Sequence, residues 1–585
     1  TRLVPFEFST TQSYMLLFVH NRLYIYKDKE LVTNINGSGN DYLTTTITSA
    51  YLTTMDYAQS VDTLILVQED MTPFKLVRGG SHSTWTISAI SFDHVPYHAF
   101  TLSASNPSAT LTPSAVDGNI TLTAGSGVFS SGNVNQYIEA EDGLGRARIV
   151  EFTSSTVVKA IVEIPFFSTS ALASGDWALE TGYEVTWSGT RGYPRTVVFH
   201  EGRLYFGGTK SRPNTLFASR VNRFFDFNPG EGLDDDGIEA TLDTGQANPI
   251  IGLFSGRDLQ IFTKGGEFFV PQSSLDPITP SNIVINGATR RGAKEGIKPL
   301  GVESGTIFIQ SAGKAIREFL FSDVELNYVS NNISLLSSHL LNSPVDMALR
   351  KATSTTDGDL LMVVNTDGTM ATYSILKDQN ITAPSLASTD GEFINVAVDV
   401  ETMYFVVKRT INSADVYYVE AFNDDNTTDS AVLLSGSSKP SSTSVSGLTH
   451  LEGETVKVIV DDAMQTNKTV SSGAITLDAV PTTYVEIGMN YTPTVTTLPV
   501  ELKLPSGNIV AQKKRIVEAT VNLYLSQNLT LDGQDFAFTA ASFFTGKKRR
   551  KPMLGYDRDG QLTFSQSQPL FFNLLGVEYK VSVGQ

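Results

Sequence analysis

Residues 195–227 read RTVVFHEGRLYFGGTKSRPNTLFASRVNRFFDF and carry a clear signal of fold class. Within this segment, the apolar and aromatic run 203–206 ends at the turn residues Gly207 and Gly208. Short runs of β-branched and aromatic residues bounded by Gly, Asn, Asp or Ser are typical of β-strands. Such runs, each about five residues long, recur along the whole chain. The sequence therefore predicts a mostly β protein made of short antiparallel strands.

A loose repeat extends outward from this segment in both directions. Each copy has an apolar strand, an acidic or Gly turn, an aromatic-rich strand and a third strand with a charged end. Copies lie near residues 12–34, 51–92, 195–227, 249–271, 298–328, 345–377 and 393–422. Radial repetition of small sheets builds β-propellers, so we expect a propeller-like β platform of about seven degenerate blades. On periodicity alone, a series of unrelated hairpins in β-sandwiches fits equally well.

Changes in composition divide the chain into domains. The repeat is lost between its second and third copies, where Ser, Thr, Ala and Gly dominate, and this indicates an inserted β domain. A later polar, Ser-rich segment is typical of a linker, and strand-like runs resume after it. The expected parts are a discontinuous platform (1–98 and 176–425), the inserted β domain (99–175), a linker or exposed loop (426–446) and a C-terminal β-sandwich-like domain (447–585).

One short helix is expected near residues 330–341. Asn331 or Asn332 is a suitable N-cap residue. The apolar residues that would share one face of this helix are Ile333, Leu336, Leu340 and Leu341. Helix is therefore a minor part of the expected fold.

Length and composition limit the classes of function. A chain of 585 residues is too long for one hydrophobic core, so several structural units are expected. Its 61 acidic and 43 basic residues give a formal net charge of −18, which disfavours nonspecific attraction to nucleic acid or an anionic membrane. The absence of cysteine excludes disulfides and Cys-ligated metal sites. No apolar run is long enough to span a membrane, so stable membrane insertion is not expected.

Signatures of catalysis are sparse. The seven histidines form no HExxH pattern, and Pro96 argues against a helix that presents His94 and His98 to a zinc ion. The nucleophile elbow, the P-loop and the dinucleotide fingerprint are also missing. Two neighbouring carboxylates, as glycoside hydrolysis needs, are almost inevitable among so many acidic residues and carry no signal. We therefore expect no enzyme activity, and no catalytic, cofactor-binding or metal-binding residues.

An acidic run, Asp234, Asp235 and Asp236, precedes Gly237. Clustered carboxylates on a turn can bind a hard cation, but the spacing does not match an EF-hand loop. We expect instead a solvated turn between blades, in which the aspartates bond to their own backbone.

A basic run stands out in this acidic chain. Its residues are Lys547, Lys548, Arg549, Arg550 and Lys551. Such a cluster suits an acidic partner surface or a phosphate, so these residues form a candidate interface. The alternative is a solvated loop before the proline that follows.

The segment 192–243, GYPRTVVFHEGRLYFGGTKSRPNTLFASRVNRFFDFNPGEGLDDDGIEATLD, resembles the central signature of the tail nozzle proteins of short-tailed bacteriophages, the tail tubular protein B family. The opening of the chain, RLVPFEFSTTQSYMLLF at 2–18 and LYIYKDKELV at 23–32, is similar to the opening of that family. Further similar segments follow in the same order at 61–77, 85–92, 328–347, 406–422, 447–460 and 568–578. The resemblance covers nearly the whole chain and is weakest over 99–175.

This resemblance implies a propeller-like platform with inserted β domains, assembled as a hexameric ring that closes the distal end of the DNA channel. It implies a structural protein of the virion tail, made in the host cytoplasm, that retains the genome and releases it on infection. The implied partners are the other copies in the ring, the upstream adaptor or head-to-tail connector ring, a tail fibre or spike, and the viral DNA in the lumen. No catalytic residue is implied, because the matching residues are architectural. They are Gly207, Gly208 and Pro213 at turns and Phe224, Phe225 and Phe227 as core anchors.

A glycan-binding or glycan-cleaving β-propeller, similar to sialidases or tailspikes, is the alternative function. Sialidase blades carry S-x-D-x-G boxes, and the sequence STDG at 388–391 misses that spacing by one residue. An extracellular adhesin would explain the Ser- and Thr-rich insert, but it predicts a secretion signal that is not evident.

A DNA channel also sets an expectation for charge. A wall rich in Lys and Arg would hold the phosphate backbone and impede ejection. The acidic composition favours a predominantly negative lumen, to which Asp234, Asp235 and Asp236 are candidate contributors.

Overall fold

A computed structural model gives the three-dimensional structure of the chain. It describes residues 1–9, 11–101, 104–140, 145–180, 183–230, 232–243, 245, 248–271, 277–303, 305–353, 358–501, 503–504, 507–508, 512–539, 541–552 and 555–583. Strands dominate these residues, and the one α-helix among them is the single turn α1 (Ser49–Leu52). The prediction of a mostly β protein is confirmed.

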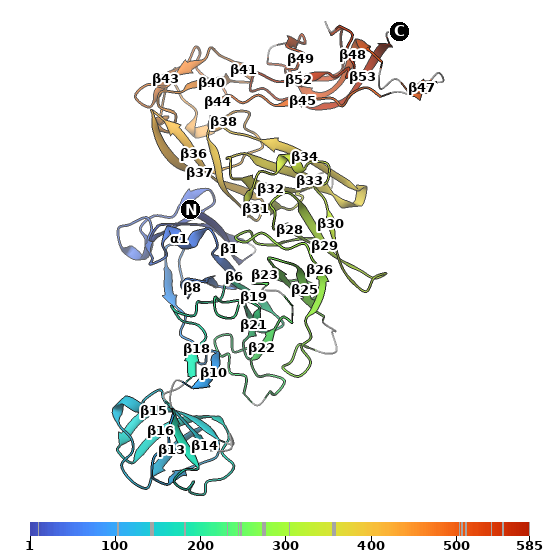
Figure 1. The fold of residues 1–585 in the computed structure, drawn as a ribbon. Helices are drawn as coiled ribbons and strands as arrows, with labels where there is room; N and C mark the ends of the chain where they lie inside the picture. Colours follow the sequence, from blue (N-terminus) through green and yellow to red (C-terminus); the bar gives the residue numbers. More distant parts are fainter. Residues whose placement is uncertain are drawn as a thin grey trace. The chain divides into compact units, whose positions relative to one another are not determined.

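Apart from the two sheets formed by residues 97–185, seven sheets follow one another through the described residues between 2 and 421, and we number them as blades 1 to 7 (Figure 1). Blades 1 to 3 are β1–β5 (Arg2–Ser9, Gln12–Val19, Arg22–Lys27, Glu30–Leu31, Leu43–Thr44), β6–β9 (Asp56–Ser60, Thr63–Gln68, Met71–Arg78, Trp85–Ala89) and β19–β22 (Thr196–His200, Arg203–Gly207, Thr215–Ala218, Ile238–Thr241). Blades 4 and 5 are β23–β26 (Ile250–Ser255, Leu259–Thr263, Glu267–Val270, Asn286–Thr289) and β27–β30 (Leu300–Val302, Gly305–Ile309, Ile316–Ser322, Asn327–Asn332). Blades 6 and 7 are β31–β34 (Pro344–Arg350, Asp359–Asn365, Met370–Leu376, Ile381–Ala387) and β35–β37 (Glu392–Asp399, Thr402–Ile411, Ala414–Ala421).

Buried apolar side chains join blades 1 to 6 in chain order, because these sheets bury apolar side chains on the faces that meet. Pairs that share one hydrophobic cluster are Phe6 and Trp85 (blades 1 and 2), Ile65 and Val197 (2 and 3), Leu216 and Ile250 (3 and 4), Phe262 and Phe308 (4 and 5), and Ile309 and Val363 (5 and 6). Sheets that pack face to face in chain order are the arrangement of a β-propeller.

The start of the chain meets the last blade. The Thr1 hydroxyl donates a hydrogen bond of 2.7 Å to the Asn395 side chain in β35. The start of the chain therefore contacts the first strand of blade 7, and the propeller-like fold class is confirmed.

The chain divides into two compact units, and the division passes through blades 6 and 7. The first unit contains 1–366, 371–386 and 395–402, and the second contains 367–370, 387–394 and 403–585.

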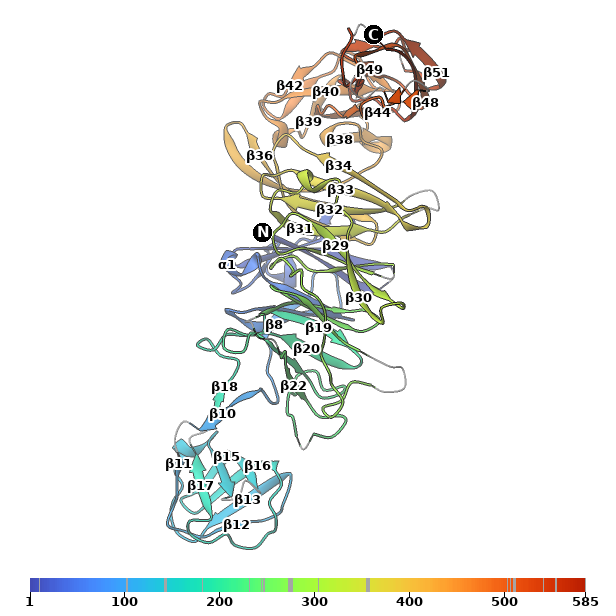
Figure 2. The ribbon, with the colours of Figure 1, turned by 45° about the vertical axis from the view of Figure 1, so that its right-hand side comes forward.

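The insert is a seven-stranded antiparallel sheet in the order β11-β17-β14-β15-β16-β13-β12 (Figure 2, cyan). Its strands are β11 (Ala104–Ser105), β12 (Leu111–Pro113), β13 (Asn119–Ala124), β14 (Tyr137–Ala140), β15 (Arg146–Ser154), β16 (Val157–Ile164) and β17 (Trp177–Glu180). The chain leaves blade 2 along β10 (Tyr97–Thr101) and returns along its partner β18 (Tyr183–Val185).

The insert extends beyond residue 175, where the sequence placed its end. Trp177 of β17 is buried in the core of the insert, and its indole nitrogen donates to the Ala109 carbonyl at 2.8 Å. Residues 176–180 therefore belong to the insert and not to the platform.

The C-terminal region has two hydrophobic cores where one domain was expected. The first surrounds Val458 and Ile487 and belongs to β38 (Asp429–Ser435), β39 (Ser444–Ser446), β40 (Thr455–Val460), β41 (Ala463–Met464), β42 (Lys468–Thr469), β43 (Ala474–Thr476) and β44 (Tyr484–Met489). The second surrounds Val521 and Phe564. The strands of this later part are β45 (Thr494–Thr496), β46 (Lys503–Leu504), β47 (Gly507–Asn508), β48 (Lys514–Ser526), β49 (Thr530–Leu531), β50 (Gln534–Asp535), β51 (Phe544–Arg550), β52 (Thr563–Ser565) and β53 (Leu574–Val583).

The prediction of a linker at 426–446 is wrong. Strand β38 pairs with β44, and β39 pairs with β43, so this segment supplies two strands of the first C-terminal core. Its serines obscured the strand pattern, while Val445, which is 2% exposed, anchors it to the core.

The prediction of a helix at 330–341 is also wrong. Residues 327–332 form β30, which pairs with β29, and only Ser338–Leu340 form a 3-10 turn. Leu336, which the helix would have buried, is 92% exposed. Pairing with β29 satisfies the backbone hydrogen bonds of 327–332, so these residues form a strand. The apolar spacing that favoured a helix therefore did not decide the structure here.

Candidate functional site

Asp56, the first residue of β6 in blade 2, fastens three blades together. Its Oδ2 accepts hydrogen bonds from the Thr196 hydroxyl at 2.6 Å and the Val197 amide at 3.1 Å, both in blade 3. Its Oδ1 forms an ion pair of 2.9 Å with Lys298 Nζ. The Thr196 hydroxyl in turn accepts the Leu253 amide of blade 4 at 3.1 Å. Because the pair is largely shielded from water, these bonds hold the first strands of the blades in register.

Asp346, in β31 of blade 6, makes the same arrangement with blade 7. Its Oδ2 accepts the Val396 amide at 3.1 Å and the Asn395 amide group at 3.4 Å. Arg2 Nη1 lies 3.9 Å from its Oδ1. Burial raises the pKa of Asp346, while Arg2 and the hydrogen bonds oppose that rise. We call Asp56 and Asp346, with their partners, the two aspartate latches.

The sequence analysis missed these latches, although a short pattern marks them. The sequences MDYA at 55–58 and VDMA at 345–348 each place an Asp between an apolar residue and x-Ala at the start of a blade. An Asp at the start of an apolar strand is unusual because it must find a partner when buried. This Asp pattern could therefore have identified both latches from the sequence alone.

Paired charges surround a small cavity between the blades. Residues from blades 1 to 4 converge on a cavity of about 20 Å³, which has room for about one water molecule. Glu69 pairs with Arg195, Arg195 also pairs with Glu295 at 3.0 Å, and Glu295 pairs with Lys264 at 2.6 Å. No space for a substrate remains at this cavity.

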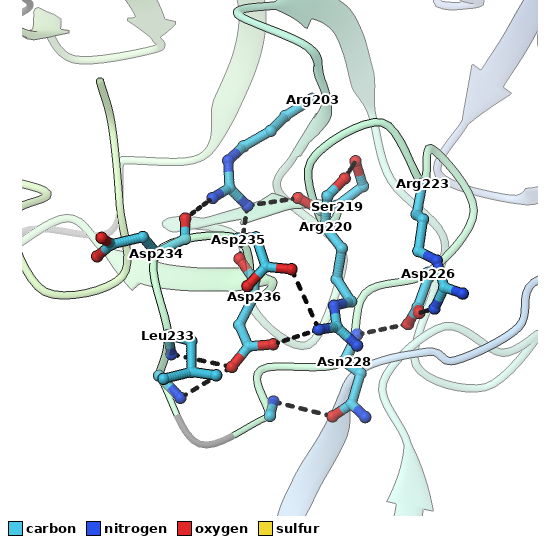
Figure 3. Close-up of polar contacts among 12 residues, drawn as sticks. Arg203, Ser219, Arg220, Arg223, Asp226, Asn228, Leu233, Asp234, Asp235 and Asp236 are labelled. Carbon is cyan, nitrogen blue, oxygen red and sulfur yellow. Dashed lines mark hydrogen bonds and ion pairs between the residues drawn. The ribbon is translucent and has the colours of Figure 1, made fainter. Parts of the chain in front are cut away.

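The backbone of the acidic turn, residues 234–236, accepts hydrogen bonds from a buried arginine (Figure 3). Arg203 in β20 is 2% exposed, and its guanidinium donates to the carbonyl oxygens of Ser219 at 2.7 Å, Asp236 at 2.5 Å and Asp234 at 2.6 Å. Burial lowers the pKa of Arg203. Three carbonyl oxygens on one guanidinium fix the path of the turn.

The three aspartates of this turn differ in role. Asp236 is 2% exposed, and its carboxylate accepts the backbone amides of Gly232 at 3.1 Å and Leu233 at 2.9 Å and pairs with Arg220 at 2.9 Å. Asp236 is thus a structural residue and not the solvated one that was expected, whereas Asp234 and Asp235 are exposed. Only these two carboxylates are available to a lumen or a partner.

The basic run is a strand and not a loop. Residues 544–550 form β51, an edge strand that pairs with β48, with Lys548 opposite Val521. Side chains alternate across a strand, so the run divides between two faces. Edge strands rich in Lys also resist pairing with other chains.

One face of the basic strand is committed to its own domain. Lys548 Nζ lies 4.4 Å and 4.2 Å from the ring centres of Phe538 and Phe544 and donates to the Ala537 carbonyl. Arg550 donates to the Gln534 side chain at 3.0 Å. These two cations cover aromatic surface next to the second C-terminal core.

The other face of the basic strand points to solvent. Lys547 pairs with Glu578 at 2.6 Å and Arg549 approaches Glu518 at 3.6 Å, with the two cations 56% and 69% exposed. Lys551 follows the strand and is exposed. These three cations remain a candidate interface.

A buried histidine lies where the chain enters the insert. His94 Nδ1 is 3.9 Å from Glu163 of β16, which also lies 3.6 Å from Arg146 and 3.8 Å from Arg148. Burial, followed by the charges of Arg148 and Arg146, lowers the pKa of His94 to about 4. His94 is therefore neutral at pH 7.

Within the described parts of the chain, no group of three or more His, Asp or Glu side chains could hold a metal ion. The described residues also contain no helix long and apolar enough to cross a membrane.

Comparisons with known proteins give no family. No protein-family model and no curated protein matches the chain. Among solved structures it is similar to apo AztD from Citrobacter koseri (9% identity, 70% of this chain, 97% of that chain, TM-score 0.29) and to BBS1N in complex with ARL6DN (7%, 72%, 92%, 0.30). It is also similar to the dihydro-heme d1 dehydrogenase NirN in complex with DHE (9%, 57%, 68%, 0.27). At these values the likeness carries no argument about function.

Proposed function

We propose that the chain is a structural subunit of a short-tailed phage tail, assembled with other copies, six in the family that it resembles, as the nozzle ring at the distal end of the DNA channel. The ordered resemblance of its segments to the tail tubular protein B family motivates the proposal. The observation that supports it further is the small cavity between the blades, which is lined by ion pairs and leaves no room for a substrate.

This small cavity bears on both DNA passage and catalysis. Duplex DNA cannot pass through a cavity of about 20 Å³ lined by ion pairs, so the proposal places the channel between several copies. The acidic groups that converge there, Asp56, Glu69 and Glu295, are each paired with Lys or Arg. A platform of this kind serves as a rigid body for assembly.

The solvent face of the basic strand supplies a docking surface for a neighbouring copy or for the upstream adaptor ring. Lys547, Arg549 and Lys551 are exposed cations in a chain of net charge −18, and charge complementarity raises the association rate of such surfaces. A tail fibre or spike would bind elsewhere on the ring.

The lumen of the proposed ring is predominantly negative. Each copy contributes a net charge of −18, and an acidic wall repels the phosphate backbone and lets DNA slide. Asp234 and Asp235 are candidates for this wall, and Asp236 is not, because it is buried.

The alternative of a glycan-cleaving propeller has little support from these side chains. Hydrolysis needs an acid and a second carboxylate beside space for the sugar, whereas Asp56, Glu69 and Glu295 are ion-paired beside a cavity of about 20 Å³. Incubation with host envelope polysaccharide, followed by analysis of released oligosaccharide, tests this alternative directly.

Electron microscopy of tail particles tests the main proposal. The expected result is a six-fold ring of this chain with a central hole. One or two copies per particle, or tight duplex DNA binding by the isolated chain at physiological salt, would contradict the proposal.

A further inference from the structure

An open cavity lies between the edge strands of blades 4 and 5. Its volume is about 430 Å³, within the range of roughly 300 to 1,000 Å³ typical of small-molecule sites. Its lining comes from β26 and the residues after it and from β30 and the turn before it: Ala288, Thr289, Arg290, Arg291, Glu325, Asn327, Tyr328, Val329 and Ser330.

Two adjacent arginines give this cavity its charge. Arg290 and Arg291 are exposed, and the described residues offer neither guanidinium an ion pair. The nearby Arg317, by contrast, already has hydrogen-bond partners: it donates to the Gln310 side chain at 2.8 Å and to the Ser330 carbonyl at 3.0 Å. Burial and then the charge of Arg291 lower the pKa of Arg317, while Glu267 opposes that shift.

The other polar groups beside the arginines differ in their availability. The Ser330 hydroxyl is shielded from water, so a ligand does not reach it. The Tyr328 hydroxyl is committed to Asp258 at 2.7 Å, and the Thr289 hydroxyl donates to Glu267. Glu325 and Asn327 are the polar side chains of the lining that a ligand can reach.

The balance of charge selects the ligand. Two arginines and Glu325 give the lining one net positive charge, which one carboxylate neutralises and a dianionic phosphate exceeds. The planar guanidinium matches a carboxylate through two parallel hydrogen bonds. Glu325 and Asn327 are partners for hydroxyl groups.

We propose that this cavity binds a saccharide that bears a carboxylate, with Arg290 and Arg291 on the carboxylate and Asn327 on a hydroxyl. The site does not depend on ring assembly, and it requires no cleavage. A uronic acid is the simplest ligand of this class.

Isothermal titration of the full chain with glucuronate, glucose, inorganic phosphate and a short single-stranded DNA tests the proposal. Glucuronate should bind, and the other three should bind at least about tenfold more weakly, since a charge-assisted hydrogen bond contributes roughly 1.5–3 kcal/mol. Equal binding of glucose, or equal or tighter binding of phosphate or DNA, would overturn the assignment.

Variants locate the site. Arg290→Ala with Arg291→Ala should lower glucuronate affinity about 10- to 100-fold. Arg257→Ala is the matched control, because Arg257 is an exposed arginine of the same blade that does not line the cavity, and its affinity should equal that of the unmodified chain. Asn327→Ala, a smaller change should the double variant fold poorly, should weaken binding several-fold. Unchanged affinity in both cavity variants would refute the site.

Discussion

The Thr196 hydroxyl donates a hydrogen bond of 2.6 Å to the carboxylate of Asp56, although 140 positions separate the two residues in the chain. The insert occupies most of that separation, so the bond closes blade 2 onto blade 3 across an entire domain. Asn395 and Asp346 repeat the relationship between blades 6 and 7. Inter-blade register thus depends on a few polar groups as well as on apolar packing.

Replacing Asp56 with Ala should destabilise the platform by about 3 kcal/mol, because it leaves the Val197 amide and the Lys298 ammonium without their partner. Urea unfolding followed by tryptophan fluorescence measures the loss. Asp323→Ala is the control, since that carboxylate is 93% exposed and its removal should change stability by less than about 0.5 kcal/mol. Equal effects in the two variants would contradict the latch.

Replacing Arg203 with Ala should cost about 3 kcal/mol and loosen the acidic turn, because three carbonyl oxygens lose their donor. Lysine at this position should recover only part of the loss, since it lacks the guanidinium fork. Hydrogen exchange over 219–237 and thermal unfolding measure the two effects. Arg223→Ala, at a residue whose side chain is 66% exposed, serves as the control and should leave both unchanged.

The two faces of the basic strand should separate docking from folding. Replacing Lys547, Arg549 and Lys551 with Ala should leave unfolding unchanged within about 0.5 kcal/mol and weaken assembly with a neighbouring copy or an adaptor ring at low salt. Replacing Lys548 and Arg550 should instead cost about 2 kcal/mol of stability, because their cation–π contacts and hydrogen bonds are lost. Normal assembly of the triple variant at both low and high salt would argue against this interface.

The folded chain should lose stability at acidic pH because of His94. Its pKa is near 6.5 when unfolded and about 4 when folded, so between these values the unfolded chain binds a proton that the folded chain does not. Stability therefore falls as pH falls through this window, by on the order of 2 kcal/mol at pH 5. Burial raises the pKa of Glu163, so this carboxyl contributes a stability change of the opposite sign as pH falls. The contribution of Glu163 is common to the unmodified chain and to the His94→Gln variant with which it is compared.

His94→Gln isolates the histidine in that comparison. The variant should lose less stability between pH 7 and pH 5 than the unmodified chain, with urea midpoints as the measurement. Parallel pH profiles would show that His94 does not titrate in this window.

The sequence by itself determined the strands and their grouping, because alternation of side chains and turn residues are local properties that survive without knowledge of any partner. The repeats at 12–34 through 393–422 fall on the seven blades for this reason. Local patterns failed where a distant partner decided the outcome. The apolar spacing of 333–341 suits a helix, yet the ladder from β29 extended the preceding backbone, and the serines of 426–446 concealed two strands.

Only the tertiary structure decided which charges are used and which are free. Asp234, Asp235 and Asp236 are identical in the sequence, but Arg203 and Arg220 bury the last and leave the first two in solvent. The five cations of 547–551 likewise differ only because a strand sends alternate side chains to opposite faces. Arg290 and Arg291 line a cavity because blade 5 lies against blade 4. The positions of charged residues are known from the sequence. The partner of each charged side chain is set by burial and by contacts between residues far apart in the chain.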